Sequence, residues 1–368
     1  MSEATRLLTK TLRLRIKDKH TKALCAQARE VNLVWNFINE LSERHTRRTR
    51  KFFSAYDLNK YTTGSTKEGL SLHSQTVQAI NEEFVARRKQ FKKIRLSWRK
   101  SSGPHRSLGW IPFKQSAITY RNGQVHYQGK AIGLWDSYGL ADYKLGTGSF
   151  SEDSRGRWYL NATIKVACKN NAANASVGID LGLKECAVAS NGQRLIGGNY
   201  RKLEAKLGLA QRANKKQLAK SLHAKIKNRR KDQLHKFSTM LTQGYGAIFV
   251  GNISSSKLIK TKMAKSTLDA SWSSLKTMLE YKSDCAGVIY EEVNESYTTQ
   301  TCSCCGARPA SSPKGRIGLR IREWTCCDCG SLNDRDLNAA RNILALGHGR
   351  LAGGIPSKLE GEMSTYSS

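Results

Sequence analysis

Hydrophobic and polar positions give the two halves of the chain different patterns. In the N-terminal half, apolar and polar side chains alternate along residues 3–16, which predicts a β-strand. Residues 20–45 and about 75–97 carry apolar side chains at helical spacing, which predicts two helices that each bury one face. Residues 107–168 return to short strands separated by turn signals such as the Asn-Gly pair at 122–123. We therefore expect a strand-rich domain interrupted by a helical insert.

The C-terminal half has a more regular order of elements. Three short strands are predicted at 176–182, 186–189 and 193–196, with a hairpin turn at Asn191-Gly192 before the third. They are followed by a basic helical region at about 201–243, an apolar strand at 247–250, a helix at 266–284, a strand at 287–293 and a last helix near the end of the chain. This β-β-β-α-β-α-β-α order is that of the RNase H-like fold, so we predict an α/β domain of this class.

Four cysteines form two Cys-x-x-Cys pairs, separated by twenty residues, between the last predicted strand and the last helix. Paired turns of this kind supply the four thiolates of a structural zinc site, which leaves no open position for water. The predicted zinc ligands are Cys302, Cys305, Cys326 and Cys329. Cys304 and Cys327 lie inside the turns and break the spacing, so they are not expected to bind the metal.

The cysteine pairs could instead form disulfides or a redox motif. The chain shows no apolar signal segment at its N-terminus, so we expect a cytoplasmic protein. Disulfides are rare in that compartment, and zinc is therefore the preferred interpretation.

Charge indicates the class of partner. The chain has 62 Lys and Arg against 29 Asp and Glu, a formal net charge of +33. Such an excess favours a nucleic-acid partner, because neutralising phosphates releases counterions. The basic residues are spread through segments predicted to fold, and region 201–235 and the helical insert are expected to contact phosphates. No apolar run reaches transmembrane length, so no membrane partner is expected.

Carboxylates in the predicted RNase H-like domain suggest metal-dependent phosphodiester chemistry. Two Mg²⁺ ions about 4 Å apart can activate water and stabilise the leaving oxygen when carboxylates from separate elements converge. Asp180 lies inside an apolar strand, where an Asp is disfavoured unless it has a function. Asp334 is expected to cap the last helix. Asp336, in the first turn, could either stabilise that helix end or point toward Asp180.

Three ordered motifs resemble those of the transposon-encoded TnpB proteins, which are relatives of the type V CRISPR effectors. They are Gly-Ile-Asp180-Leu-Gly, then Tyr297-Thr-Thr-Gln-Thr-Cys-x-x-Cys-Gly, then Cys-x-x-Cys-Gly-x-x-x-Asp-Arg-Asp336-x-Asn-Ala-Ala-Arg-Asn-Ile-Leu. The resemblance covers about residues 171–348. Residues 32–39 and 156–160 resemble, more loosely, parts of the family's helical recognition insert and wedge domain.

The resemblance implies an RNA-guided DNA endonuclease of a transposon. Such a protein binds a guide RNA made from the transposon end, reads a short adjacent motif, and cuts double-stranded DNA at one RuvC-like site. Asp180 and Asp336 are then catalytic, Mg²⁺-binding carboxylates, and region 201–235 contacts the guide RNA or its heteroduplex with DNA. We expect a monomer in the prokaryotic cytoplasm, associated with the nucleoid.

The implied architecture is a RuvC-like domain with an inserted zinc ribbon, preceded by a β-barrel-like wedge domain that a helical recognition insert interrupts. The expected bounds are 1–18 and 105–168 for the wedge domain, 19–104 for the insert, 169–175 for a linker, 176–297 and 333–348 for the RuvC-like domain, 298–332 for the ribbon, and 349–368 for a disordered tail.

One position departs from the family pattern. The family has a catalytic Glu at the end of the fourth strand, where this chain has Gly251. The predicted fifth strand lies beside the fourth and carries Glu291 and Glu292. Strand alternation allows only one of these two side chains to face the site. We predict that Glu292 replaces the missing carboxylate and binds magnesium, with Glu291 as the alternative. The competing hypothesis is a nuclease-dead, RNA-guided DNA-binding repressor.

Overall fold

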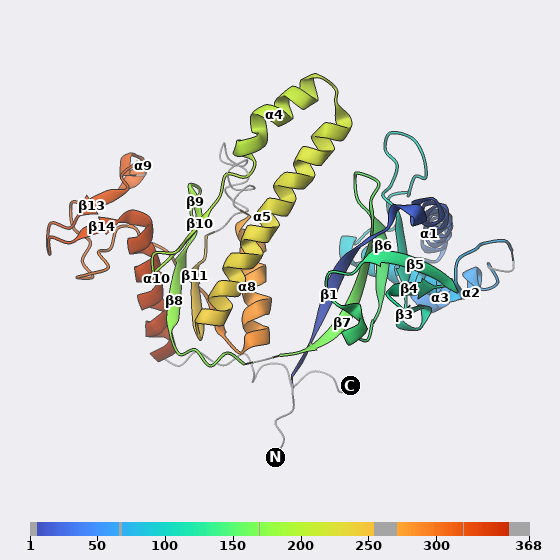
Figure 1. The fold of residues 1–368 in the computed structure, drawn as a ribbon, viewed down its shortest axis with the longest axis horizontal. Coiled ribbons are helices and arrows are strands. Elements are labelled where there is room, and N and C mark those ends of the chain that lie inside the picture. The colour runs from blue at the N-terminus through green and yellow to red at the C-terminus, as the bar shows by residue number, and fades with distance from the viewer. Residues whose placement is uncertain (1–5, 66–67, 169, 254–270, 319, 353–368) are drawn as a thin grey trace, which may run out of the picture. The chain divides into compact units, whose positions relative to one another are not determined.

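The computed structural model describes residues 6–65, 68–168, 170–253, 271–318 and 320–352 (Figure 1). The chain divides into two compact units, Met1–Ala167 and Cys168–Ser368. Each unit has its own sheet and its own hydrophobic core.

The first unit is built on a seven-stranded sheet with the order β2-β6-β7-β1-β5-β4-β3. Its main elements are β1 (Leu7–Ile16), α1 (Thr21–Thr49), α2 (Ala55–Thr62), α3 (Ser74–Phe91), β2 (Trp110–Phe113), β3 (Ile118–Arg121), β4 (Gln124–Tyr127), β5 (Lys130–Trp135), β6 (Gly148–Glu152) and β7 (Trp158–Ala167). The first and last strands, β1 and β7, pair antiparallel from Leu7↔Ala167 to Arg15↔Tyr159. Strand β1 precedes the three helices and β7 follows them, so the helices form an insertion within the sheet, as predicted.

Two local differences from the predicted elements have simple causes. The helix predicted at about 75–97 ends at Phe91, because Lys92 takes a left-handed conformation with φ of 50°. Helix α2 was not predicted. It is short, and it begins with a capping box in which Ser54 and Asp57 satisfy each other's backbone N–H groups.

The second unit is built on a five-stranded sheet with the order β10-β9-β8-β11-β12. Its elements are β8 (Ser176–Asp180), β9 (Glu185–Ala189), β10 (Arg194–Ile196), α4 (Arg201–Arg212), α5 (Lys216–Gly244), β11 (Ala247–Gly251), α8 (Trp272–Ala286), β12 (Ile289–Val293), α9 (Gly315–Gly318), β13 (Glu323–Thr325), β14 (Leu332–Asp334) and α10 (Arg335–Ala352). Strands β8, β11 and β12 are parallel neighbours. The predicted order of elements is confirmed, and the fifth strand, β12, lies beside the fourth, β11, as expected.

Helices cover both faces of this sheet (Figure 1). Side chains of Ile179 and Val250 pack with α5 and α8 in the main core, while Phe249 and Val293 pack with Ile343 of α10 on the other face. This division follows from the two-residue alternation of a strand. It decides which side chains of β8, β11 and β12 can share a site.

Helix α10 lies unusually close to β8. A Cβ atom added at Gly178 would lie 2.2 Å from the Ala340 carbonyl oxygen and 2.5 Å from the Leu344 nitrogen. Only glycine permits this approach of two backbones.

Two predicted segments differ from expectation. The tract predicted as a linker at 169–175 is bonded to the second unit, because the Asn171 side chain donates to the carbonyl oxygens of Thr242 and Tyr245. The predicted tail began at 349, but α10 continues to Ala352, and residues 353–368 lie outside the described residues. In the described part of the chain, no helix is long and apolar enough to cross a membrane.

Candidate metal centres

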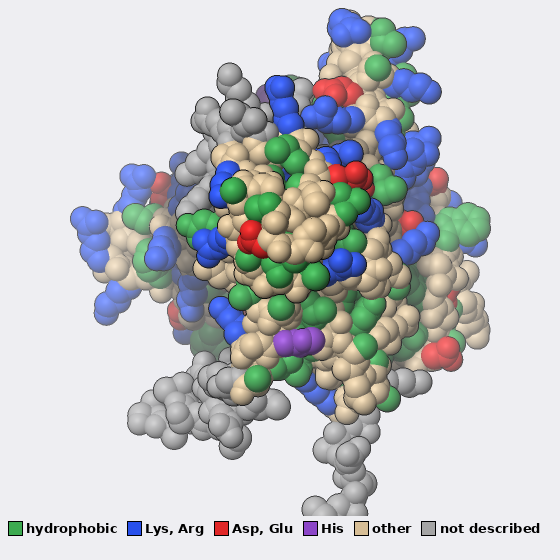
Figure 2. Space-filling view, turned by 90° about the vertical axis from the view of Figure 1, so that its left-hand side faces the viewer, with side chains coloured by type: hydrophobic (Ala, Val, Ile, Leu, Met, Phe, Trp, Pro, Cys, Tyr) green, Lys and Arg blue, Asp and Glu red, His purple; other side chains and the backbone are tan. Residues whose placement is uncertain are grey.

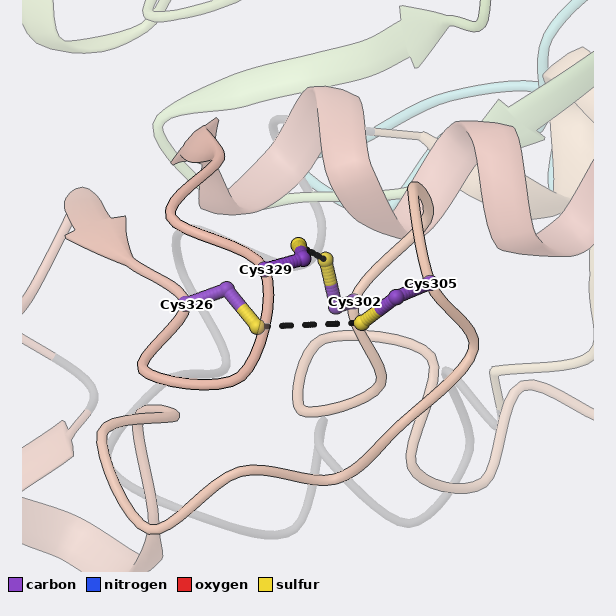
Figure 3. A group of neighbouring side chains, drawn as sticks. All are labelled: Cys302, Cys305, Cys326 and Cys329. Carbon is purple, nitrogen blue, oxygen red and sulfur yellow. Dashed lines mark hydrogen bonds between the residues drawn. The ribbon is translucent and has the colours of Figure 1, made fainter.

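The four cysteines that were predicted as zinc ligands lie together (Figure 3). Their sulfur atoms all lie within 4.8 Å of one another, and the group could hold a metal ion such as zinc. The Sγ atoms of Cys302 and Cys329 are 3.7 Å apart, and those of Cys305 and Cys326 are 3.8 Å apart. A tetrahedron with Zn–S bonds of about 2.3 Å has edges of about 3.8 Å, which these two separations match.

The two cysteine turns have the same backbone geometry. In the first turn the Gly306 N–H donates to the Cys302 carbonyl at 2.9 Å, and in the second the Gly330 N–H donates to the Cys326 carbonyl at 2.8 Å. Both glycines have positive φ, 76° and 71°. This requirement explains why each Cys-x-x-Cys is followed directly by Gly.

The electrostatics of the cysteine group favour a thiolate at Cys302. Burial opposes ionisation of this side chain, but hydrogen bonds from Ser331 and from the backbone of Cys305 and Cys304 outweigh it and lower the pKa of Cys302 to about 6. A thiolate is the form that binds metal. Cys304 and Cys327 are exposed and lie outside the group of four.

A second group of charged side chains gathers at the carboxyl ends of the parallel strands. Asp180 ends β8 and is only 9% exposed, and the described residues offer its carboxylate no hydrogen bond or ion pair. Burial, together with the negative charges of Asp336 and Glu295, raises the pKa of Asp180 to about 8, although Arg335 and Arg322 oppose the shift. Asp180 is therefore a buried carboxyl that lacks a cation at short range.

Asp336 and Asp334 have separate roles at the start of α10. The Leu337 N–H donates to Asp334 Oδ1 at 2.8 Å, so Asp334 is the helix cap, as predicted. Asp336 is 8% exposed and accepts from Arg322 Nη1 at 2.5 Å and from Arg335 Nε at 3.2 Å. Its charge contributes to the raised pKa of Asp180, so the tertiary structure resolves the open alternative: Asp336 lies near Asp180.

The structure does not place Glu292 with these aspartates. Glu292 pairs in register with Val250, whose side chain belongs to the core on the α5 and α8 face, and its carboxylate accepts from Lys276 Nζ of α8 at 2.6 Å. The prediction that Glu292 faces Asp180 is therefore wrong, because strand alternation turns it to the opposite face.

Glu291, the alternative, is on the same face of the sheet as α10, but it lies further from the carboxyl ends of the strands than Asp180 does. It pairs in register with Phe249, two residues before the end of β11, and it binds Arg350 near the end of α10. An arginine therefore holds its charge away from the strand ends.

A further carboxylate, Glu295, lies beside the end of β11 and was not predicted from the sequence. Glu295 follows β12 by two residues, and its Oε2 atom lies 2.3 Å from the position that a Cβ at Gly251 would take. Burial raises the pKa of Glu295, against the charge of Lys276 and the backbone N–H of Ile253. No strand or helix pattern marks this loop residue. The one available signal was a third acidic residue just beyond Glu291 and Glu292.

The arrangement of the acidic group differs from that of the cysteines. In the described part of the chain, the cysteines are the one set of three or more possible ligands whose atoms all lie within 4.8 Å of one another. The acidic group is looser, and two arginines hold Asp336.

Asparagines of α10 connect the acidic group to the cysteine turns. The Nδ2 atoms of Asn338 and Asn342 both donate to the Thr301 carbonyl at 2.7 Å, just before Cys302. The Asn338 Oδ1 atom accepts from the Ser303 N–H at 2.8 Å. These contacts link the first cysteine turn to the helix that carries Asp336, and no sequence pattern predicted them.

Helices α4 and α5 form a basic helical hairpin that projects from the second unit (Figure 1). In α5, most side chains before Leu234 are exposed, and Ile226 is the one fully buried residue of that stretch. The exposed cations there include Lys216, Lys220, Lys225, Lys227, Arg229 and Lys231. Figure 2 shows Lys and Arg side chains on this projection, with few Asp or Glu among them. The surface can bind a polyanion such as a nucleic-acid backbone.

Comparisons with known proteins agree with this arrangement. Residues 272–343 match the family described as "Cas12f1-like, TNB domain". The chain is 32% identical over 298 residues to a protein of Streptomyces pristinaespiralis that is named as a candidate RNA-guided DNA endonuclease, covering 75% of this chain and 69% of the relative. It is 27% identical over 234 residues to the candidate RNA-guided DNA endonuclease InsQ of Escherichia coli K12, covering 55% of this chain and 56% of InsQ.

Two further similarities are to a viral protein and to a solved structure. The chain is 32% identical over 146 residues to the TnpB-like protein L79 of Acanthamoeba polyphaga mimivirus, covering 36% of this chain. The fold is similar to that of Cas12f1 in a cryo-EM structure with a single guide RNA and target DNA. The TM-score is 0.57 at 14% identity, and the match covers 92% of this chain and 98% of Cas12f1. At this identity the structural match shows the fold alone.

The cysteine geometry predicts one bound zinc per chain. Replacing Cys302 or Cys326 by Ser should reduce zinc, measured by elemental analysis of purified protein, to less than about half an equivalent. Replacing Cys304 or Cys327 by Ser is the matched control and should leave the zinc content unchanged. Zinc loss in these controls would show that the ligand set is wrong.

The burial of Asp180 predicts a pH-dependent stability difference. An unfolded Asp ionises near pH 4, whereas folded Asp180 keeps its proton until about pH 8, so rising pH destabilises the fold across this window. Asp180→Asn removes the effect. In zinc-loaded protein without added magnesium, its Tm should exceed that of the wild type by on the order of 2–6 °C at pH 8, and by less at pH 5. A Tm difference independent of pH would contradict this prediction.

Proposed function

This chain belongs to the TnpB family, and we propose on that basis that it is an RNA-guided DNA endonuclease of a transposon. The observation that carries the proposal is the buried acidic group, in which Asp180 and Asp336 meet from a strand and a helix that are distant in sequence. A strongly basic chain with such a group is suited to metal-dependent cutting of nucleic acid.

The second unit is the proposed nuclease domain, with the RNase H-like, RuvC-type architecture. Its parallel strands β8, β11 and β12 end at one edge of the sheet, and α10 brings Asp336 to the same edge. The first unit is the proposed wedge domain with its helical recognition insert.

Asp180 and Asp336 would hold the catalytic magnesium. Oxygen ligands suit Mg²⁺, and a buried Asp180 without a partner is the kind of group that a divalent cation would neutralise. Bound magnesium would supply an activated water and a stabilised leaving oxygen for phosphodiester hydrolysis. In this arrangement Arg322 and Arg335 orient Asp336, and burial of Asp180 excludes bulk water from its carboxylate.

The zinc site would have a structural role. Four thiolates leave zinc no position for a substrate. The hydrogen bonds from Asn338 and Asn342 fix α10 against the first cysteine turn, so a turn held by zinc would also hold this helix. Zinc would thereby help to hold Asp336 in place.

The proposed partners are a guide RNA made from the transposon end and a double-stranded DNA target beside a short adjacent motif. The exposed cations of α5 would contact phosphates of the guide or of its heteroduplex with DNA. Phosphate contacts give affinity without sequence specificity, and sequence would be read by base pairing with the guide.

The basic hairpin predicts a defined salt dependence. The triple substitution Lys225→Gln, Lys227→Gln and Arg229→Gln should weaken guide-RNA binding at least about tenfold at 150 mM salt and should reduce the salt slope of the affinity by about two to three. Electrophoretic mobility shifts at several salt concentrations measure both. A matched control, Lys130→Gln with Lys144→Gln and Lys165→Gln at exposed positions of the first unit outside the helical insert, separates this effect from a general loss of positive charge. An unchanged salt slope in the α5 variant would contradict the prediction.

The acidic group predicts which variants lose cleavage. RNA that copurifies with the protein should be sequenced, and a matching duplex should then be cut in the presence of Mg²⁺. Asp180→Ala and Asp336→Ala should each abolish cutting while RNA binding persists, and the double variant should be no worse than either. Asp334→Ala should retain cutting, because a helix cap contributes only about 1 kcal/mol. Wild-type protein that binds guide and target but never cuts would instead be a DNA-binding repressor.

A further inference from the structure

The space beside Gly251 is filled by a carboxylate. Strand β11 ends at Gly251 and β8 ends at Asp180, and the residues before them, Val250 and Ile179, are register partners. The two strand ends are therefore neighbours. The position of a Cβ at Gly251 would lie 2.3 Å from Glu295 Oε2 and 3.3 Å from Glu295 Cβ, so any larger residue at 251 would displace this side chain.

The charges around these strand ends are not balanced equally. Asp336 is held by Arg322 and Arg335. Asp180 is nine-tenths buried and has no hydrogen bond or ion pair among the described residues, and Glu295 Oε2 is a buried oxygen without a hydrogen-bond partner. A buried, unpartnered carboxylate oxygen beside a second, largely buried carboxylate is costly unless a cation lies between them.

We propose that Glu295 is a metal ligand that acts with Asp180 and Asp336, reaching the strand ends from the loop after β12 through the space that Gly251 leaves. This assignment rests on the proposed endonuclease function and names a residue of its metal site. Glu295 would complete a set of three carboxylates that come from a strand, a loop and a helix.

The contacts of the other two glutamates support this choice. Lys276 of α8 neutralises Glu292 on the opposite face of the sheet, and Arg350 binds Glu291 away from the strand ends. Glu295 is the acidic residue of this segment with a buried oxygen that lies at the strand ends.

The test is Mn²⁺ titration of the zinc-loaded full-length protein, freed of RNA and followed by electron paramagnetic resonance. Glu295→Gln keeps the shape of the side chain and removes its charge. It should raise the Kd for Mn²⁺ at least about tenfold, whereas the matched control Glu292→Gln should leave it within about twofold. In the guided cleavage assay, Glu295→Gln should lose about 100-fold or more of the rate, with guide-RNA affinity unchanged.

A double variant tests whether a carboxylate attached at position 251 can replace the carboxylate of Glu295. An aspartate carries its carboxylate oxygens about 2.4 Å from its Cβ, close to the separation of the Gly251 Cβ position from Glu295 Oε2. Gly251→Asp combined with Glu295→Ala should recover part of the Mn²⁺ affinity that Glu295→Ala alone loses.

The outcomes separate the two proposals. Wild-type affinity for Mn²⁺ in Glu295→Gln, or an equal loss in Glu292→Gln, would overturn the assignment of Glu295, even if wild-type protein cuts DNA. Wild-type protein that binds Mn²⁺ through Glu295 but cuts no matched duplex would leave the assignment standing and would overturn the endonuclease proposal.

Discussion

The close contact between α10 and β8 is the constraint on which the acidic group depends. Gly178 has no side chain, so the backbone of α10 at Ala340 and Leu344 can lie directly against the strand. This contact brings the first turn of α10, and with it Asp336, beside Asp180 at the strand end. A side chain at Gly178 would push the helix away, and it would separate two carboxylates that lie 156 residues apart in the sequence.

Charge at the strand ends is held in an unequal balance. Burial disfavours the ionised form of Asp180, and its acidic neighbours add to the effect. Arginines form ion pairs with Asp336, whereas they act on Asp180 only at longer range and leave its pKa raised. Without a bound cation, this arrangement lowers the stability of the folded protein. A cation that binds there relieves the unfavourable electrostatic energy, which strengthens its binding. This is the usual compromise between stability and function at a preorganised site.

The cysteine group and the acidic group form one mechanical assembly. The chain between them is short: Cys329 precedes Asp336 by seven residues, and β14 pairs with β13, which follows Arg322 directly. Arg322 binds Asp336, and Asn338 binds the first cysteine turn. Both the backbone and these side-chain contacts therefore connect the cysteine turns to the acidic group, so that a rigid turn restrains the position of Asp336. This coupling gives a physical reason for the cysteine turns to be inserted beside the acidic group.

Local patterns in the sequence predicted the group of four cysteines, the order of elements in the second unit and the cap at Asp334, and they singled out Asp180 as a candidate. Each depends on spacing within a few residues, because a turn, a strand or a helix end is recognised from its own side chains. The proximity of Asp336 to Asp180 was an open alternative on spacing alone, and the packing of α10 decided it.

Glu295 and the true positions of Glu291 and Glu292 were decided only by the tertiary structure. Alternation in the sequence showed that Glu291 and Glu292 face opposite ways, but it could not show which face of the sheet carries Asp180. That depends on the register of β12 against β11, where Val293 lies beside Gly251 and Glu292 beside Val250. Glu295 follows the strand in a loop, where no periodicity constrains a side chain. Its position depends on where the strand ends and on the space that Gly251 leaves, and both are properties of the packed sheet.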